Sequence, residues 1–206
     1  MALADFEADV VRGEAVTGRL LKEKGMRLRF FRHPYLHCGR DLTTKASLER
    51  FLSDRGYRIA PVTIDADDYV FAAAYSRATE RGDGPMKHRI DLEYVRFMER
   101  AFDYSERLSQ ALFGREIRQV LLLHANALNS DHFSDLARMM KKRGYRFVSL
   151  DDALADEAYA SSDTHTGEES ITWLDRWAIT KGMKNEGNAL DAFPEIPDFV
   201  AKAGGS

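Results

Sequence analysis

The sequence lacks a second cysteine, a surplus of positive charge and long apolar runs, and each absence excludes a class of protein. Its single cysteine, Cys38, cannot form an internal disulfide, which fits a reducing compartment. The formal net charge of −3 offers no basic surplus for nucleic acid or acidic membranes. No apolar stretch approaches the roughly 20 residues that span a bilayer. The first residues also lack the basic start and apolar stretch of a signal peptide.

What remains is the composition of an ordinary globular protein. Of the 206 residues, 44% are hydrophobic and 31% are charged, which argues against a disordered chain. A chain of this length buries about 70% of the surface of its unfolded state, enough for one domain with a real core. We therefore expect a folded domain with no nucleic acid partner and no transmembrane segment.

Helix-type and strand-type segments alternate along the chain. Apolar residues at spacings of three and four predict helices over residues 3–24, 42–55, 70–81, 86–113 and 131–142. Short apolar runs predict strands over residues 28–31, 57–64, 120–123 and 146–150. This alternation is typical of a parallel sheet with crossover helices, so the expected fold class is α/β. Trp173 and Trp177, four residues apart, predict a helix that packs the tail onto the body.

Polar side chains follow three of the predicted strands. Arg32 follows the first strand, the cluster Asp65-Ala66-Asp67-Asp68 follows the second, and His124 closes the third. In α/β proteins the carboxyl ends of parallel strands meet at one edge, where sites are built. An arginine that enters an interior needs a carboxylate partner, and the acidic cluster supplies candidates. An imidazole suits proton transfer at neutral pH. The alternatives are a structural ion pair and a structural histidine.

Two further groups of residues bear on this edge. Asn126 and Asn129 follow His124 in the sequence and can orient its ring or cap the next helix. His33, His37 and Cys38 contain metal-ligating atoms, but Pro34 disfavours a shared helical face for the two histidines. No cysteine pair and no His-Glu motif accompanies them. We therefore expect no metal ligands among them.

Three short motifs resemble those of the polysaccharide deacetylase family, also called the NodB-homology or carbohydrate esterase family 4 domain. Arg32-His33-Pro34-Tyr35 is similar to its Arg-x-Pro-Tyr motif. Asp65-Ala66-Asp67-Asp68-Tyr69 is similar to Asp-x-x-Asp-Trp, with tyrosine in place of tryptophan. Leu121-Leu122-Leu123-His124 is similar to Leu-x-x-His. The motifs occur in the family's order, each after a predicted strand, over roughly residues 3–155.

The resemblance implies both a fold and an activity. Residues 1–155 would form an incomplete (β/α) barrel whose N-terminal strands are missing, and residues 156–206 a C-terminal extension with a frayed end. The family hydrolyses acetyl groups on amino sugars, with a divalent metal, usually zinc, that polarises the acetyl carbonyl and activates water. The implied site residues are His124 as general acid, Asp68 and Arg32 as the pair that tunes the catalytic base, Tyr35 as an oxyanion donor through its backbone N–H, Leu122 beside the acetyl methyl and Tyr69 as an aromatic wall.

The chain departs from the family upstream of Arg32. There the family carries its catalytic base and metal ligands, on a Thr-Phe-Asp-Asp strand and a His-x-x-x-His segment. Residues 1–30 contain Asp5 and Asp9 but no Asp-Asp pair and no histidine. The chain therefore resembles the C-terminal two-thirds of such a domain, without the zinc ligands. An export signal would lie in the missing part, so a periplasmic or secreted parent protein stays open.

These differences predict how the chain behaves. We expect weak zinc binding and no deacetylase activity from this chain alone, because a general acid cannot replace a missing metal and base. Missing strands would leave a sheet edge open, which favours association between molecules. Two other functions stay open: a non-catalytic carbohydrate-binding or interaction domain, and a hydrolase of small amides.

Overall fold

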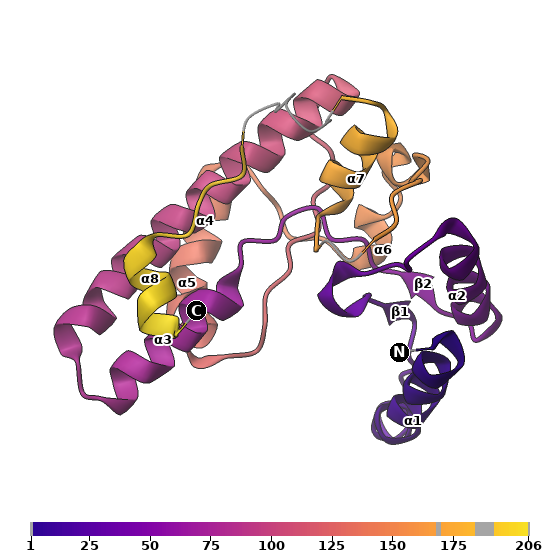
Figure 1. Cartoon of the computed structure of the whole chain (residues 1–206), viewed down its shortest axis with the longest axis horizontal. Helices are drawn as coiled ribbons and strands as arrows, with labels where there is room; N and C mark the ends of the chain where they lie inside the picture. The colour runs from indigo at the N-terminus through magenta and orange to yellow at the C-terminus, as the bar shows by residue number, and fades with distance from the viewer. Residues whose placement is uncertain (1, 168–169, 184–191, 206) are drawn as a thin grey trace.

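The computed structural model describes residues 2–167, 170–183 and 192–205 (Figure 1). The α-helices are α1 (Leu3–Lys22), α2 (Leu42–Asp54), α3 (Asp68–Glu80), α4 (Gly84–Phe113), α5 (Ala127–Lys142), α6 (Leu150–Ala153), α7 (Trp173–Thr180) and α8 (Asp198–Gly204). Two short 3-10 helices are η1 (Pro34–Leu36) and η2 (Glu157–Ala160). The strands are β1 (Phe30–Phe31) and β2 (Arg58–Ile59).

The expected incomplete (β/α) barrel is wrong. The structure is 61% helix and 4% strand, and β1 and β2 form a two-stranded parallel sheet with Phe30 opposite Arg58. Within the described residues, the parallel arrangement continues as a single bridge between Ile64 and Leu121. Short apolar runs carry no periodicity that separates a ladder strand from other extended backbone, which explains the error.

Two of the predicted strands show why the ladder is so short. Pro61 lies inside the predicted strand 57–64, and its missing N–H removes a ladder hydrogen bond between β2 and Ile64. The predicted strand 146–150 does not form: residues 146–149 are exposed and non-helical, and α6 begins at Leu150. The helical crossovers are present, but the strands that they should connect are mostly single extended segments.

All five helices predicted before residue 150 form, and local side-chain caps specify the starts of three of them. The side chain of Asp41 accepts a hydrogen bond from the N–H of Thr44 at 2.7 Å at the start of α2. Asp83 caps α4 in the same way. α5 starts four residues earlier than expected, because Asn126 caps it by accepting from the N–H of Asn129 at 2.8 Å.

Helix α4 connects two hydrophobic cores. It has 30 residues, about 45 Å of helix, and runs the length of one arm of the molecule (Figure 1). Its first part packs with α3, α5 and α8 around Phe71 and Phe97. Its last part packs with α7 and η1 around Tyr104 and Trp177. The second arm continues through the sheet to α2 and α1, of which α1 buries no residue fully.

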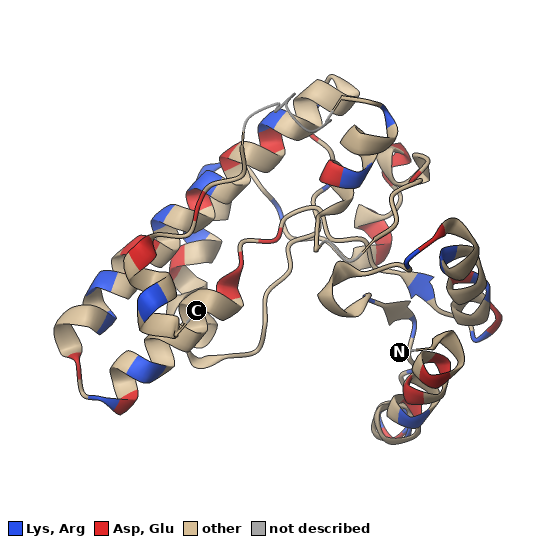
Figure 2. Ribbon diagram, in the orientation of Figure 1, with Lys and Arg blue, Asp and Glu red and all other residues tan. Residues whose placement is uncertain are grey.

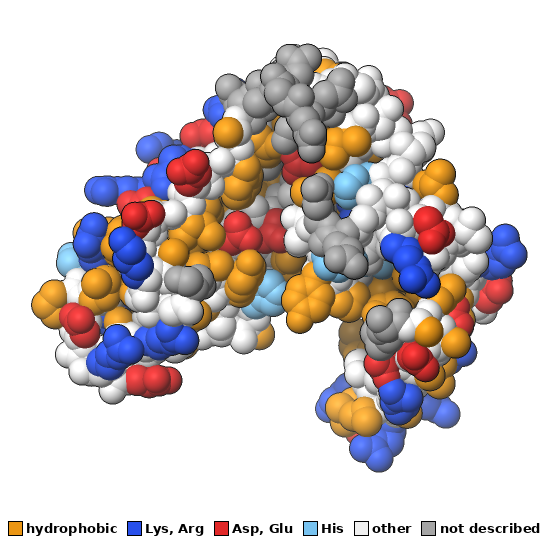
Figure 3. All heavy atoms as spheres, in the orientation of Figure 1, with side chains coloured by type: hydrophobic (Ala, Val, Ile, Leu, Met, Phe, Trp, Pro, Cys, Tyr) orange, Lys and Arg blue, Asp and Glu red, His pale blue; other side chains and the backbone are white. Residues whose placement is uncertain are grey.

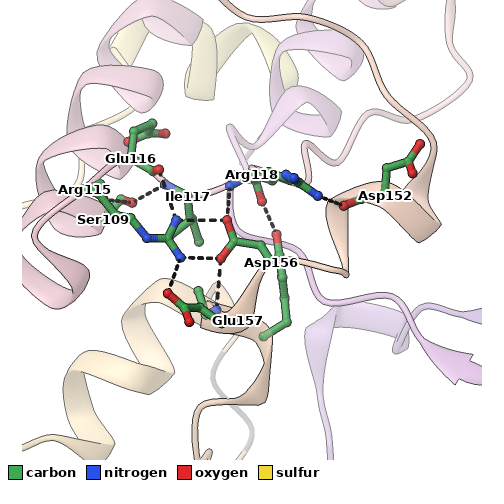
Figure 4. A network of polar contacts seen from close by, with 10 residues as sticks. Ser109, Arg115, Glu116, Ile117, Arg118, Asp152, Asp156 and Glu157 are labelled. Carbon is green, nitrogen blue, oxygen red and sulfur yellow. Dashed lines mark hydrogen bonds and ion pairs between the residues drawn. The ribbon is translucent and has the colours of Figure 1, made fainter.

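The predicted extension, residues 156–206, begins at a polar network (Figure 4). The guanidinium of Arg115, just after α4, donates to both carboxylate oxygens of Asp156 at 2.9 and 2.6 Å. The N–H of Arg118 donates to the same carboxylate at 3.1 Å. The Arg115 guanidinium, together with the backbone N–H groups of Ala158 and Arg118, holds the pKa of Asp156 well below its usual range. This network ties the start of the extension to the end of α4.

The extension packs onto the body as the two tryptophans predicted. Trp173 and Trp177 are buried in the second core. The end that was predicted to fray carries α8, which packs along α3. Gly204 allows this close approach, since a Cβ there would lie 3.3 Å from the carbonyl oxygen of Val70. In the described part of the chain, none of the helices has the length and apolar character that crossing a membrane requires.

Candidate functional site

The candidate site lies between the two arms. In Figure 3, acidic and histidine side chains lie along the hollow between the arms, with hydrophobic side chains on either side. Acidic residues lie along the segment that leads into α3 and at the start of that helix (Figure 2). The bridge between Ile64 and Leu121 explains this gathering. Both segments leave the bridge in the same direction, so the residues after Ile64 and after Leu121 meet.

Asp68 and His124 form the centre of the site. Asp68 is the first residue of α3 and is 1% exposed. Its Oδ1 lies 2.6 Å from Nδ1 of His124, and its Oδ2 accepts the backbone N–H of His124 at 2.9 Å. Because an ionised carboxylate only accepts, this contact places the ring proton on Nδ1 and leaves Nε2 for a ligand. The His124 side chain is 41% exposed, so its ring is accessible.

The two other carboxyl groups of the cluster, Asp67 and Asp65, bind a proton more tightly than usual, because burial raises the pKa of each. Burial, and then the charges of Asp65 and Asp68, raise the pKa of Asp67 to about 6. Burial is also the main cause that raises the pKa of Asp65. Asp67 has a left-handed backbone with φ of 48°, and its side chain makes no cap hydrogen bond. A carboxyl group with a pKa near 6 can exchange a proton at neutral pH.

Aromatic and apolar groups surround His124. Tyr69, 58% exposed, presents its ring edge-on to the imidazole with 6.4 Å between centroids. Burial and the charges of Asp67 and Asp65 raise the pKa of the Tyr69 hydroxyl. On another side of His124 lies an open cavity of about 710 Å³, lined by uncharged residues that include Leu123, Asn126 and Phe133. The imidazole therefore lies between an acidic cluster and an uncharged cavity.

The structure places the other predicted site residues differently. Arg32 is exposed and donates to the carbonyl of His33 at 3.1 Å, whereas Asp68 pairs with His124. Arg32 still lies close enough to Asp65 to lower the pKa of that carboxyl slightly, against the larger effect of burial.

Two predicted substrate-binding residues lie away from His124. Tyr35, 77% exposed, lines a separate cavity of about 360 Å³ beside α1. Leu122 packs against the second core, and it is Leu123 that lines the cavity beside His124.

The described residues do not fit a zinc ion. They contain no group of three or more His, Cys, Asp or Glu side chains placed to hold a metal. His33 is buried between Phe31 and Trp173, and the charges of Arg176 and Lys45 act on its ring, a setting that opposes a further cation. The chemistry below is therefore derived from the side chains of this chain alone.

Sequence reasoning predicted that Asn126 and Asn129 cap the next helix or orient the ring of His124. The cap is confirmed, whereas the amides contact Asp68 and the backbone carbonyl of His124, so they act on the ring only through Asp68. Asn126 caps α5, and its amide lies 3.3 Å from Oδ2 of Asp68. The amide of Asn129 donates to the same oxygen and to the carbonyl of His124. Sequence reasoning missed Tyr94, whose hydroxyl donates to Asn129. No sequence signal separates a tyrosine with a bonded hydroxyl from one that only packs.

Comparisons with known proteins add nothing to this geometry. No family model matches the chain, and neither a curated protein nor a solved structure matches it.

Proposed function

We propose that this chain carries the proton-donating and sugar-binding part of a hydrolase site that removes acetyl groups from amino sugars. The observation that supports it most is the pair of contacts between Asp68 and His124. Oδ1 of Asp68 lies 2.6 Å from the ring Nδ1, and Oδ2 accepts the backbone N–H at 2.9 Å. A carboxylate that fixes one ring nitrogen prepares the other for proton transfer. The three family-like motifs supply the substrate class.

The chemistry follows from the free ring nitrogen. Hydrolysis of an acetamide joins the oxygen of water to the acetyl carbon and breaks the carbon–nitrogen bond. The imidazolium gives its Nε2 proton to the departing amine, and Asp68 stabilises the imidazolium before the transfer. Among the nearby carboxyl groups, Asp67 is the one suited to accept the proton of the water, because its pKa is about 6.

A reactive acetyl ester tests the reactivity of His124 without requiring a metal. We expect the chain to hydrolyse p-nitrophenyl acetate at least about 10-fold faster than the H124A variant. The neutral imidazole acts as the base in this reaction through Nε2, the same nitrogen that carries the donated proton in the imidazolium. H88A is the matched control, since His88 is an exposed histidine outside the site. Equal rates for the native chain and H124A would remove His124 from the proposed chemistry.

Sugar binding tests the substrate class. With N-acetylchitotetraose, we expect chemical-shift changes in NMR spectra at His124, Tyr69 and Phe133, which surround the hollow. No change at these residues at millimolar sugar would contradict the proposal. N-acetylchitotetraose deacetylation, measured as released acetate with and without zinc, then shows whether the chain completes the reaction alone, and we expect that it does not.

A second candidate, a carbohydrate-binding domain without catalysis, is favoured by the exposed rings of Tyr69 and Phe133 beside polar groups. For this function, Y69A weakens sugar binding several-fold, whereas H124A binds the sugar normally and the native chain lacks His124-dependent ester hydrolysis. The two variants therefore separate the two functions in one set of titrations.

A further inference from the structure

We infer that Asn129 and Tyr94 are positioning residues for His124, and that they form a hydrogen-bonded chain from the buried core to the exposed ring. The effect on activity rests on the proposed function, but the geometry does not. Asn129 lies in the first turn of α5 and Tyr94 in α4, and both are buried. Neither residue belongs to the three family-like motifs, and the contact of Tyr94 with Asn129 is visible only in the structure.

The amide of Asn129 has one possible orientation. Its nitrogen donates to Oδ2 of Asp68 and, at 2.8 Å, to the carbonyl of His124. Its oxygen accepts the hydroxyl proton of Tyr94. Each N–H of the amide thus has its own acceptor, and the oxygen has a donor. A flipped amide would set its oxygen against the Asp68 carboxylate, so the carboxylate and the hydroxyl together select the observed orientation.

Tyr94 anchors this chain in the first core. Its ring packs against Phe71, with 5.5 Å between centroids, and against His132 at 6.2 Å. Burial, and then the charge of Asp68, hold the pKa of the Tyr94 hydroxyl far above its usual value. The hydroxyl therefore keeps its proton and donates it to Asn129.

Asp68 depends on these donors. Its carboxylate is buried and is held by the backbone and ring of His124, by Asn126 and by Asn129. A buried carboxylate is costly unless its oxygens are hydrogen-bonded. Asn129 also fixes the carbonyl of His124, so it holds that residue at two points. Its loss would let the carboxylate and the imidazole turn away from each other.

The experiment compares N129L, N129D and Y94F with Y104F, the matched control. Tyr104 is an equally buried tyrosine whose hydroxyl donates to Asp175, outside this chain of contacts. The first readout is the ring tautomer of His124, measured from its ¹⁵N chemical shifts. We expect the Nδ1–H form in the native chain and Y104F, and a growing Nε2–H fraction in Y94F and N129L.

The second readout is the pH profile of His124-dependent ester hydrolysis. We expect N129L to lose about 10-fold in rate, within the range of a misplaced general base. N129D should move the midpoint of the profile to higher pH, because an added carboxylate favours the imidazolium. A merely structural asparagine would change neither the midpoint nor the tautomer in a folded variant.

The two proposals fail in different ways. If the native chain shows no His124-dependent hydrolysis, the proposed function fails, and the tautomer measurement still decides the positioning role. If Y94F and N129L fold, as circular dichroism would show, and keep the native tautomer, the positioning role is overturned. Y94F removes one oxygen atom, so it retains a test of the inference even where the Asn129 variants do not fold.

Discussion

Asp67 and Asp68 are adjacent in sequence and opposite in environment. Asp68 lies at the first helical position of α3, and its carboxylate meets a set of donors. Asp67, one residue earlier, has a left-handed backbone. Burial is the main cause that raises its pKa, and the charges of Asp65 and Asp68 raise it further. Such a conformation persists where the surrounding structure demands it, and it is common at functional sites.

Replacing Asp67 with glycine tests this strain. We expect D67G to raise the free energy of unfolding by about 1 kcal/mol in urea titrations, because glycine adopts positive φ at no steric cost. The control is D83G at the start of α4, where φ is −82° and the side chain caps the helix. The free energy of unfolding of D83G should fall by about 0.3 kcal/mol. A loss of stability in D67G would contradict the interpretation of strain.

The same variant has a pH signature. The pKa of Asp67 is about 6 in the folded chain and 3.8 in its ordinary state. The folded state therefore binds the proton more tightly than the unfolded state, and this contribution to stability falls as pH rises from about 4 to 6. D67G removes that term, so its gain in stability should be larger at pH 7 than at pH 4. An equal gain at both pH values would show that the charge of Asp67 is not involved.

At the scale of elements, helix α7 holds η1 in a strained turn. Tyr35 and Leu36 have φ of 52° and 55°, and the buried guanidinium of Arg176 donates to the carbonyl of Leu36. Beside them, the imidazole of His33 stacks on Trp173, is 1% exposed, and has no hydrogen-bond partner at either nitrogen in the described structure. The docking of α7 therefore depends on a neutral His33.

Acid should weaken this docking. Burial is the main cause that lowers the pKa of His33 to about 4, and the charges of Arg176 and Lys45 lower it further. The charge of Asp163 raises it by less than these effects combined. The unfolded state then binds the proton more tightly. The contribution of neutral His33 to the free energy of unfolding is fully present above about pH 6.5 and is lost as pH falls toward 4.

The H33F variant keeps the ring and removes both nitrogen atoms. We expect it to be more stable than the native chain by about 1 to 3 kcal/mol, since two unsatisfied buried polar atoms are gone. Its acid transition should move to lower pH, whereas H88F at an exposed position should leave the transition unchanged. Tryptophan fluorescence reports the event directly, because the two tryptophans of the chain, Trp173 and Trp177, lie in α7. The same acid midpoint in H33F would exclude this mechanism.

At the scale of the whole molecule, the ladder stops before it encloses a core. No ladder forms in the described chain between residues 116–122 and residues 145–149, and a cavity of about 570 Å³ lies between the two segments. Phe147 and Val148 are exposed beside it. Extended backbone without a ladder partner and exposed apolar side chains both favour association between molecules.

Charge placed at this edge should weaken association. We expect the native chain to self-associate with increasing concentration in sedimentation velocity experiments and V148K to do so less, because an edge lysine opposes strand pairing. V16K is the matched control: Val148 and Val16 are 54% and 57% exposed, and Val16 lies on α1, away from the edge. Equal behaviour of the two variants would place the association surface elsewhere.

Sequence reasoning reached half of the candidate site. It selected Asp68 and His124 from their positions after apolar runs, and the bridge between Ile64 and Leu121 brings them together. It paired Asp68 with Arg32, whereas the structure leaves Arg32 exposed. Motif order ranks candidates, but it contains no information on which side of a segment each residue faces.

The sequence alone determined the presence of the five helices before residue 150, and contacts within a few residues set the starts of three of them. Asp41, Asp83 and Asn126 each cap a helix whose start lies next to them in the chain. The strands and the site depend on contacts between distant segments, such as that of Asp68 with His124, 56 residues away. Only the tertiary structure decided those contacts, because a ladder bond or a buried carboxylate needs a partner that local sequence does not specify.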